Sequence, residues 1–391
     1  MTALTTGRPK DWSARRRERL VEAVGAIARR HSHTVARHDA DASVHTELVD
    51  ELCAAGYHLA PLDRRYGGGE HGLLDIVTAQ AALAEVDAST ALGVGMHLMV
   101  VGGETWNPQW SPAARHRLFS AVERRGALVN VLATEPAMGS PQGDARPATS
   151  LVPDGPGRWR LHGLKTYSTF SPVLRYAVVY AGIDDGSGDV ARVVVPMQDV
   201  GVGIEHTWDT VGMRATASHS VYFAGVLLTD DHILIRHPFE ERARRPAMTP
   251  WFALPVAAAY LGIARGARDE AIAAYRQPRE GRRPGAEAEA RRSIGEIEWR
   301  LRAAESMLEA AASRADALEA RGGLSAFDAA TKLSVTRTAL DVVDLACRVA
   351  GGAALRRGSR LERAWRDVRC SSVHPPTDVA ALELLADHTL N

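Results

Sequence analysis

The segment ALVNVLATEP, residues 127–136, marks an abrupt change in the local pattern of the chain. It is short, rich in β-branched and apolar residues, and is followed by similar segments at 158–169, 176–184, 191–197 and 220–228. Turn-forming stretches such as PDGPGR (153–158) and DDGSGD (184–189) separate these segments. Short runs bounded by glycine, proline and aspartate predict an antiparallel sheet, which we expect within residues 126–240.

The residues on both sides of this region have the periodicity of helices. On the N-terminal side, apolar positions three or four residues apart recur, as in Leu20, Val24 and Ile27. On the C-terminal side, one long apolar stripe comprises Ile294, Ile297, Leu301, Ala304, Leu308 and Ala311. We therefore predict an α+β protein with an N-terminal helical domain (1–125), a central antiparallel, β-barrel-like domain (126–240) and a C-terminal helical bundle (241–391).

The composition argues against several classes of protein. Lysine plus arginine and aspartate plus glutamate both number 47 in 391 residues, so we expect no nucleic-acid-binding surface. We expect no membrane span and no secretory signal, because no apolar run is long enough. Cys53, Cys347 and Cys370 are widely spaced, which predicts buried, inert thiols in a cytoplasmic protein without a disulfide framework or a metal site.

Four motifs in order resemble the acyl-CoA dehydrogenase superfamily. They are LATEPAMGS (132–140), LHGLKTYST (161–169), DTVGMRATASHSVYF (209–223) and RVAGGAALRRGSRLERAWRDVR (348–369). Each motif is weak alone, but together they extend over most of the chain on the expected helix–sheet–helix background. The resemblance implies non-covalent FAD between the β domain and the C-terminal helices, an acyl thioester on the other flavin face, and a homo-oligomer, either a dimer or a tetramer.

The resemblance also implies which residues contact the cofactor. The backbone of 132–134 would contact the isoalloxazine ring, and the turn at 167–169 would line its edge. Arg348 would contact the adenosine or pyrophosphate portion, or else it would only interact with the C-terminus of its helix. The alternative for Thr134, Ser168 and Thr169 is that they are ordinary strand residues. The alternative for the arginine-rich run near 279 is that it is a solvent-exposed stretch without a phosphate partner. The complete set is Leu132, Ala133, Thr134, Ser140, Tyr167, Ser168, Thr169, Arg279, Arg348, Gly351, Gly352 and Thr377.

The catalytic carboxylate of the family is missing at both positions where it usually occurs. The C-terminal position is Pro375, and the position at the start of the helix near 250 is Phe252; the family's substrate-side arginine next to it corresponds to Ala253. None of these side chains can accept the α-proton of an acyl thioester. His374 is the candidate replacement, because a neutral imidazole is a competent base or acid near neutral pH. Asp378 is instead expected to be an N-cap.

The leading functional hypothesis is FAD-dependent dehydrogenation of an acyl thioester on coenzyme A or a carrier protein. The redox partner would be an electron-transfer flavoprotein, oxygen or a flavin reductase. A two-component flavin monooxygenase of the same fold is the alternative, since a pocket histidine there positions substrate or oxygen and no α-proton base is needed. A flavin- or acyl-binding subunit without catalysis is a third possibility.

Two further histidines are expected to have structural roles. His97 is expected to be a core residue with its hydrogen bonds satisfied, and His219 is expected to be a strand residue.

Overall fold

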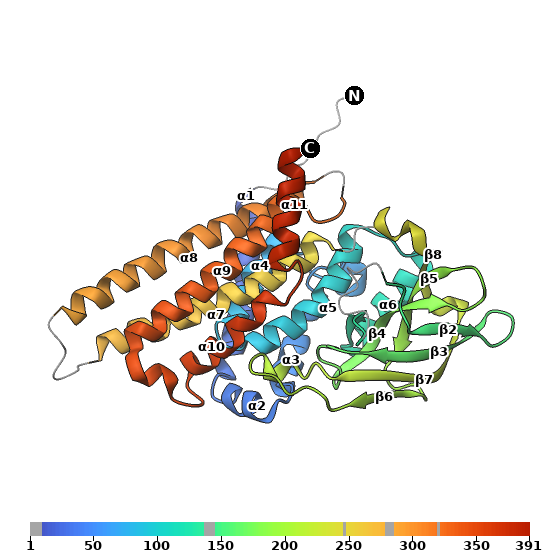
Figure 1. Ribbon diagram of the computed structural model, residues 1–391, viewed down its shortest axis with the longest axis horizontal. Coiled ribbons are helices and arrows are strands. Elements are labelled where there is room, and N and C mark those ends of the chain that lie inside the picture. The colour runs from blue at the N-terminus through green and yellow to red at the C-terminus, as the bar shows by residue number, and fades with distance from the viewer. Residues whose placement is uncertain (1–9, 137–144, 245–247, 278–284, 319–320) are drawn as a thin grey trace.

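A computed structural model describes residues 10–136, 145–244, 248–277, 285–318 and 321–391. Helices, then strands, then helices follow each other along the chain, as expected (Figure 1). The strands gather on one side of the molecule, and the long C-terminal helices extend to the other side. Among the described residues, no helix is both long enough and apolar enough to span a membrane.

The N-terminal helices form a layer against the sheet and the C-terminal bundle. They are α1 (Lys10–Arg30), α2 (Val35–Asp41), α3 (Thr46–Ala54), α4 (Leu73–Ala84), α5 (Ala88–Trp106) and α6 (Pro112–Arg125), with short 3-10 turns η1 (Tyr57–Leu59) and η2 (Arg64–Tyr66). Local signals set their ends. Ser111 caps α6 by accepting a hydrogen bond from the N–H of Ala114, and Gly126, at a φ of 58°, ends it.

The central domain is a single eight-stranded sheet. Its strands are β1 (Leu128–Leu132), β2 (Ser150–Pro153), β3 (Arg158–Lys165), β4 (Leu174–Ile183), β5 (Asp189–Pro196), β6 (Val202–Glu205), β7 (Ser220–Thr229) and β8 (Ile233–Pro238). The 3-10 turns η3 (Arg214–Thr216), η4 (Asp230–His232) and η5 (Phe239–Arg244) connect or follow them.

The predicted topology of this sheet requires correction. The strand order is β6-β7-β3-β2-β4-β5-β8, so the sheet is open and not barrel-like. It is also mixed, because β1 and β2 both pair parallel to β4. β1 pairs with the first part of β4 and β2 with its last residues, Gly182 and Ile183. One long strand thus has two short partners along the same edge, a pairing that local patterns do not specify.

The C-terminal helices form the bundle. They are α7 (Pro250–Arg276), α8 (Ala286–Ala317), α9 (Ala326–Ala350), α10 (Arg360–Arg369) and α11 (Asp378–Leu390), with 3-10 turns η6 (Gly351–Leu355) and η7 (Cys370–Ser372). The predicted apolar stripe of α8 is buried from Ile297 onward, whereas Ile294 is only half-buried. A capping box between Ser325 and Asp328 begins α9, and Gly351 follows its last residue.

Helix α5 lies between the sheet and α7 and is buried along nearly its whole length. Its His97 joins it to β1: Nδ1 accepts the N–H of Val129 (3.1 Å) and Nε2 donates to the carbonyl of His58 (2.9 Å). Burial lowers the pKa of His97 to about 3, so the ring is neutral. The prediction of a satisfied core histidine is confirmed.

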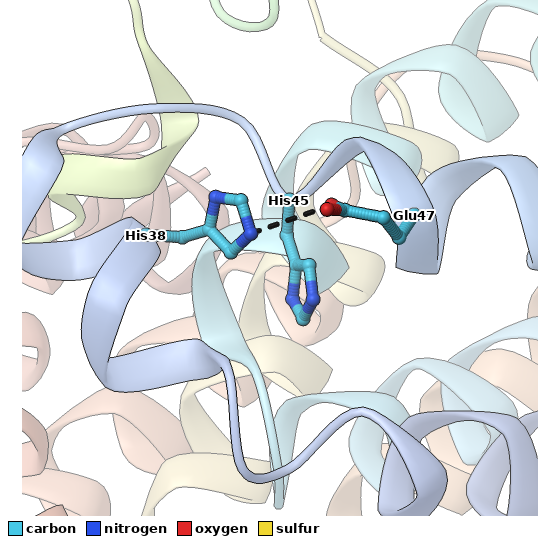
Figure 2. Close-up of side chains that lie close together, drawn as sticks. All are labelled: His38, His45 and Glu47. Atoms are coloured by element: carbon cyan, nitrogen blue, oxygen red, sulfur yellow. Dashed lines mark ion pairs between the residues drawn. The ribbon is translucent and has the colours of Figure 1, made fainter.

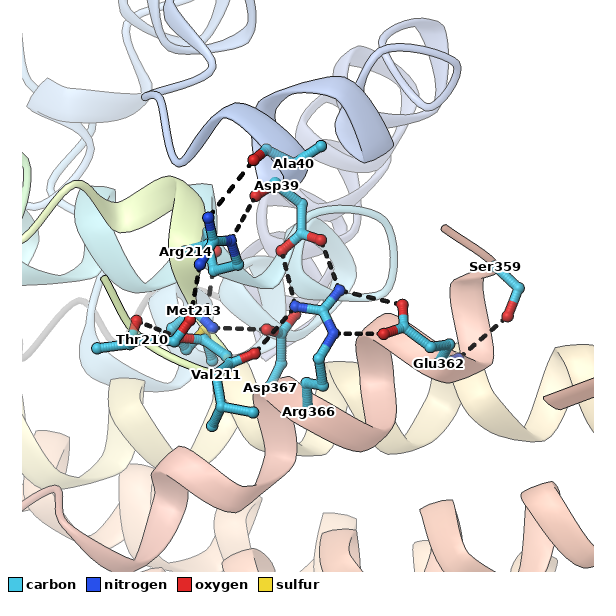
Figure 3. Close-up of polar contacts among 12 residues, drawn as sticks. Asp39, Ala40, Thr210, Val211, Met213, Arg214, Ser359, Glu362, Arg366 and Asp367 are labelled. Atoms are coloured by element: carbon cyan, nitrogen blue, oxygen red, sulfur yellow. Dashed lines mark hydrogen bonds and ion pairs between the residues drawn. The ribbon is translucent and has the colours of Figure 1, made fainter. Parts of the chain in front are cut away.

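One cluster of polar contacts joins all three domains (Figure 3). The Arg366 guanidinium on α10 contacts both carboxylate oxygens of Asp39, on α2, and both of Glu362. It also donates to the carbonyl of Val211 at 3.0 Å. These contacts use all five N–H donors of the arginine. Asp367, the next residue, accepts the N–H of Met213 at 2.6 Å.

The packing of α5 against the sheet domain predicts a strong effect of one added methyl group. In Gly93→Ala, the new Cβ would lie 2.2 Å from ring atoms of Phe170, a fully buried side chain. We expect a loss of about 1–3 kcal/mol in the free energy of unfolding, measured by urea denaturation. Gly295→Ala is the matched control, because its Cβ would meet no atom within 4 Å on α8. That change should stabilise the protein by about 0.5–1 kcal/mol, and equal effects of the two changes would contradict the prediction.

Candidate functional site

The turn after β3 has an unusual backbone that its neighbours hold in place. Tyr167 and Phe170 have positive φ angles of 55° and 63°, which are costly for residues other than glycine. The N–H of Ser168 donates to the carbonyl of His219 (3.1 Å), and that of Phe170 to the carbonyl of Thr216 (2.8 Å). The segment just before β7 therefore fixes this strained turn. His219 lies one residue before that strand rather than in it.

The side chains of this turn offer polar groups and one exposed ring. Ser168 is fully buried, and its hydroxyl has no hydrogen-bond partner among the described residues. Tyr167 is 66% exposed, with its ring edge-on to Trp208. The hydroxyl of Thr169 is hydrogen-bonded to that of Ser218 at 3.0 Å. An unpaired buried hydroxyl beside an exposed aromatic ring fits a planar ligand with polar edges, such as a flavin.

The end of β1 lies beside this turn, as the two motifs predict. The N–H of Thr166 donates to the carbonyl of Thr134 at 2.9 Å. Leu132 is buried, and Ala133 and Thr134 are half-buried. In the part of the chain that the structure describes, the N–H groups of Ala133 and Thr134 make no hydrogen bond. Two free N–H groups in succession can stabilise negative charge on a bound ring, which is the role expected for them.

A buried ion pair joins these two motifs, and sequence reasoning missed it. The Lys165 ammonium lies 2.6 Å from Glu135 Oε1, and both side chains are almost fully buried. Glu135 also accepts the N–H groups of Ala148 (2.7 Å) and Thr149 (3.0 Å). Burial lowers the pKa of Lys165 to about 8, although Glu135 opposes the shift. Glu135 and Lys165 both occur in the quoted motifs, but no local sequence pattern indicates that their side chains form an ion pair.

The candidate base, His374, lies at the junction of three helices. Its Nδ1 is 2.7 Å from the hydroxyl of Tyr260, a fully buried residue of α7. Burial lowers the pKa of His374 to about 4; the nearby Lys332 ammonium lowers it further, and the carbonyl of Cys370 opposes the shift. The ring is therefore neutral at physiological pH.

Sequence reasoning placed an apolar residue at each usual base position, and the structure adds their exposure. Phe252 and Pro375 are half-buried, and Ala253, at the expected position of the substrate-side arginine, is fully buried. No described contact joins His374 directly to the turn at 166–170. The connection runs instead through α10, because Asp367 holds Met213, and residues 216–219 hold the turn.

The remaining predicted residues have other positions. The hydroxyl of Thr377 accepts the N–H of Ala380 (3.3 Å) and so caps α11; the prediction that Asp378 is the cap was wrong by one residue. Asp378 pairs with Arg337 at 3.1 Å. Arg348, Gly351 and Gly352 are exposed at the end of α9, and a Cβ at Gly352 would meet no atom within 4 Å. Ser140 and Arg279 lie outside the described residues.

A cavity of about 470 Å³ lies between α3 and the edge of the sheet, but it is not the predicted site. Its lining includes Asp50 and Cys53 of α3 and Arg175 of β4, and it includes none of the predicted cofactor residues.

The three cysteines are free thiols, and burial raises the pKa of Cys53 and of Cys370 to about 12. Deprotonation is therefore unfavourable for both, as expected for inert thiols.

One group of side chains has the residue types of a metal site: His38, His45 and Glu47 (Figure 2). The ring nitrogens of His45 are both engaged, Nδ1 with Asp87 (3.0 Å) and Nε2 with Thr34 (2.9 Å). The two imidazole rings are stacked with centroids 4.3 Å apart, an arrangement in which their in-plane lone pairs do not converge. We therefore assign this group to the structure of the α2–α3 connection.

Three consecutive parts of the chain match the three domain models of one protein family. The acyl-CoA dehydrogenase N-terminal domain matches residues 15–107, the middle domain 130–226 and the C-terminal domain 250–387. The "Putative acyl-CoA dehydrogenase YdbM" of Bacillus subtilis (strain 168) is 35% identical over 94% of this chain and 95% of its own. L-evernosamine nitrososynthase of a Micromonospora species is 30% identical over 95% and 90% of the two chains.

A solved structure is similar over the same length. KijD3 in complex with FMN and dTDP-3-amino-2,3,6-trideoxy-4-keto-3-methyl-D-glucose has a TM-score of 0.82 and is 28% identical. The similarity covers 96% of this chain and 94% of that chain. Similarity along the whole length means that the three domains are related to those proteins as one unit.

The Glu135–Lys165 pair generates a test of the site's framework. Glu135→Gln leaves a buried ammonium group without its carboxylate, so we expect a loss of about 3–5 kcal/mol in the free energy of unfolding at pH 7. Burial lowers the folded pKa of Lys165 to about 8 and Glu135 opposes this shift, so without the carboxylate the folded pKa falls further and the variant loses the lysine proton at lower pH than the wild type does. The deficit should therefore shrink as pH rises from 7 to 10 in denaturant titrations.

A second variant controls for the loss of the carboxylate itself. Glu135→Gln combined with Lys165→Met removes the unpaired charge and should recover most of the lost stability. If the single and double variants are equally unstable at every pH, the ion pair is not the source of the effect.

Proposed function

Because this chain belongs to the acyl-CoA dehydrogenase family, we propose that it binds a flavin and acts as a flavin-dependent monooxygenase. The observation that carries this proposal is the neutral His374 ring, hydrogen-bonded to Tyr260, one residue before Pro375, which we match to the family's usual carboxylate position. A monooxygenase needs a hydrogen-bond donor near the flavin but no acceptor for an α-proton.

The hydrogen-bonding pattern of His374 supports this role. Tyr260 is fully buried, burial raises its pKa, and Nδ1 of His374 is the one acceptor that the described residues offer its hydroxyl. With Nδ1 as the acceptor, the proton of the neutral ring is on Nε2, and the carbonyl of Cys370 is the acceptor that the described residues offer the ring. To act as a base, the ring would have to become a cation close to Lys332, in surroundings that already disfavour the charged form.

The residues of the site have distinct roles in this proposal. A reduced flavin supplies the electrons with which molecular oxygen is activated for transfer to a substrate. The N–H groups of Ala133 and Thr134 stabilise the electron-rich ring, and the hydroxyl of Ser168 binds its edge. Tyr167 covers the ring from solvent. Support for a flavin site also comes from the FMN in KijD3, and support for a monooxygenase comes from the similarity to the dibenzothiophene monooxygenase of Mycolicibacterium goodii, 25% identical over 95% of this chain.

The choice between FAD and FMN depends on the half of the site beyond the ring. Arg348, Gly351 and Gly352 are exposed, as expected if they contact an adenosine portion held by a neighbouring copy of the chain. An oligomer, either a dimer or a tetramer, belongs to this proposal, together with a partner reductase that supplies reduced flavin.

Dehydrogenation of an acyl thioester is the second candidate function. The 35% identity to YdbM over nearly the whole chain favours it. The hypothesis requires His374 to accept the α-proton, with electron-transfer flavoprotein or oxygen as the final acceptor. The apolar residues at 252, 253 and 375 weigh against it.

Flavin binding at the turn after β3 is tested by one hydroxyl. Ser168→Ala should weaken the binding of both FAD and FMN by about tenfold, the equivalent of one hydrogen bond, as measured by quenching of flavin fluorescence. Thr149→Val is the matched control, since Thr149 is buried in the same domain with an equally unpartnered hydroxyl. Unchanged affinity in Ser168→Ala would remove the turn from the site.

The two candidate functions differ in their reactions with thioesters and oxygen. We expect short- and long-chain acyl-CoA thioesters to leave the absorbance of the protein-bound oxidised flavin unchanged under anaerobic conditions. With reduced flavin and oxygen, His374→Phe should release hydrogen peroxide about tenfold faster than the wild type, because a hydrogen-bond donor in the oxygen-binding region is lost. Rapid bleaching of the flavin by a thioester would instead establish the dehydrogenase.

A further inference from the structure

Two lysines of the described chain are completely buried, and they have very different partners. Lys165 has the carboxylate of Glu135 at 2.6 Å. Lys332, on α9, donates to two backbone carbonyls, those of Ser371 (3.1 Å) and His374 (2.8 Å). Among the described residues, no carboxylate lies within ion-pair distance of Lys332. A buried ammonium with only neutral acceptors is costly.

Because burying the ammonium of Lys332 is costly, anchoring the 371–374 turn does not by itself explain why residue 332 is a lysine. A neutral side chain of similar length, such as glutamine, could donate the same two hydrogen bonds without burying a charge. The charge must then have an effect of its own. The ionisable groups that interact with His374 are Lys332 from α9 and Tyr260 from α7, and Lys332 is the one that carries a positive charge.

We propose that Lys332 is the positioning residue of His374: its ammonium holds the 371–374 turn through two carbonyls and keeps the imidazole neutral as a hydrogen-bond donor. The inference rests on the proposed function only in placing His374 in the active site. The effect of Lys332 on the ring is a property of the protein itself and can be measured without a substrate.

The geometry makes both parts of this role possible. The two carbonyls belong to residues three apart, so one ammonium fixes both ends of the turn that carries the ring. The hydroxyl of Ser371 is buried without a partner, which leaves the ammonium as the group that anchors that end of the turn. The Tyr260 hydroxyl then fixes the ring at Nδ1.

The other charged groups around this turn do not cancel the effect. Asp378 at the start of α11 raises the pKa of Lys332, although burial lowers that pKa to about 8, so the lysine keeps its proton at neutral pH. Asp378 is itself paired with Arg337 at 3.1 Å. Asp367 and Cys370 act on Tyr260, and both raise its pKa, which keeps its hydroxyl protonated.

The test is the titration of His374 in intact protein whose histidine rings are labelled with ¹³C and followed by NMR. The signal is assigned by its absence in His374→Gln. In the wild type we expect a pKa of about 4. In Lys332→Gln, which keeps two donors but loses the charge, the titration should move upward by about one unit or more. Lys332→Met should show the same shift.

Arg337→Met is the matched control for removal of a positive charge. Arg337 is on the same helix, five residues further on, but it is 55% exposed and paired with Asp378. Solvent and salt screen such a charge, so the titration of His374 should not move.

Three outcomes would overturn the inference. The first is a folded Lys332→Gln protein in which His374 titrates as in the wild type. The second is an equal shift in Arg337→Met. The third is loss of folding in Lys332→Gln, which would show that the charge serves stability alone. The result is independent of the reaction: a shifted titration without faster peroxide release in His374→Phe supports the role of Lys332 and contradicts the proposed function.

Discussion

The paired contacts of Arg366 and Asp367 connect both halves of the candidate site. Arg366 joins α10 to α2 through Asp39 and to residue 211 of the sheet domain. Asp367 fixes Met213, and the segment that follows holds the strained turn at 166–170. The same helix α10 leads within a few residues to His374. A displacement of α10 would therefore move the turn at 166–170 and the histidine together.

Close backbone approach makes this junction rigid. A Cβ at Gly212 would lie 2.4 Å from the carbonyl oxygen of Arg366, so only glycine fits there. Close to this junction, Gly93 of α5 allows Phe170 to pack directly against the helix backbone. Because Phe170 belongs to the strained turn, core packing and the polar junction act on the same few residues. This arrangement explains how positive φ angles persist at residues with side chains.

The family fold and the chemistry of the site are separable in this protein. The three domains and the motif segments are retained, whereas residues 252 and 375, which we match to the family's carboxylate positions, are apolar, and a buried lysine lies close to His374. Burial and the lysine charge favour a neutral histidine ring. The chemistry of a site depends on a few side chains carried by the scaffold, here those that follow α10 and those at the start of α7.

Local information in the sequence determined the order of helices and strands, the buried stripe of α8 and the glycine that ends α9, since these depend on periodicity, turn chemistry and residue type. The family resemblance also implied that 132–134 and 167–169 lie close together. Only the tertiary structure decided the rest. The open, mixed sheet, the Glu135–Lys165 pair and the cap at Thr377 in place of Asp378 were not foreseen. Contacts such as Asp39 with Arg366 and Lys332 with His374 join residues far apart in the chain. No local pattern specifies such partners, because burial and pairing are set by how whole elements pack.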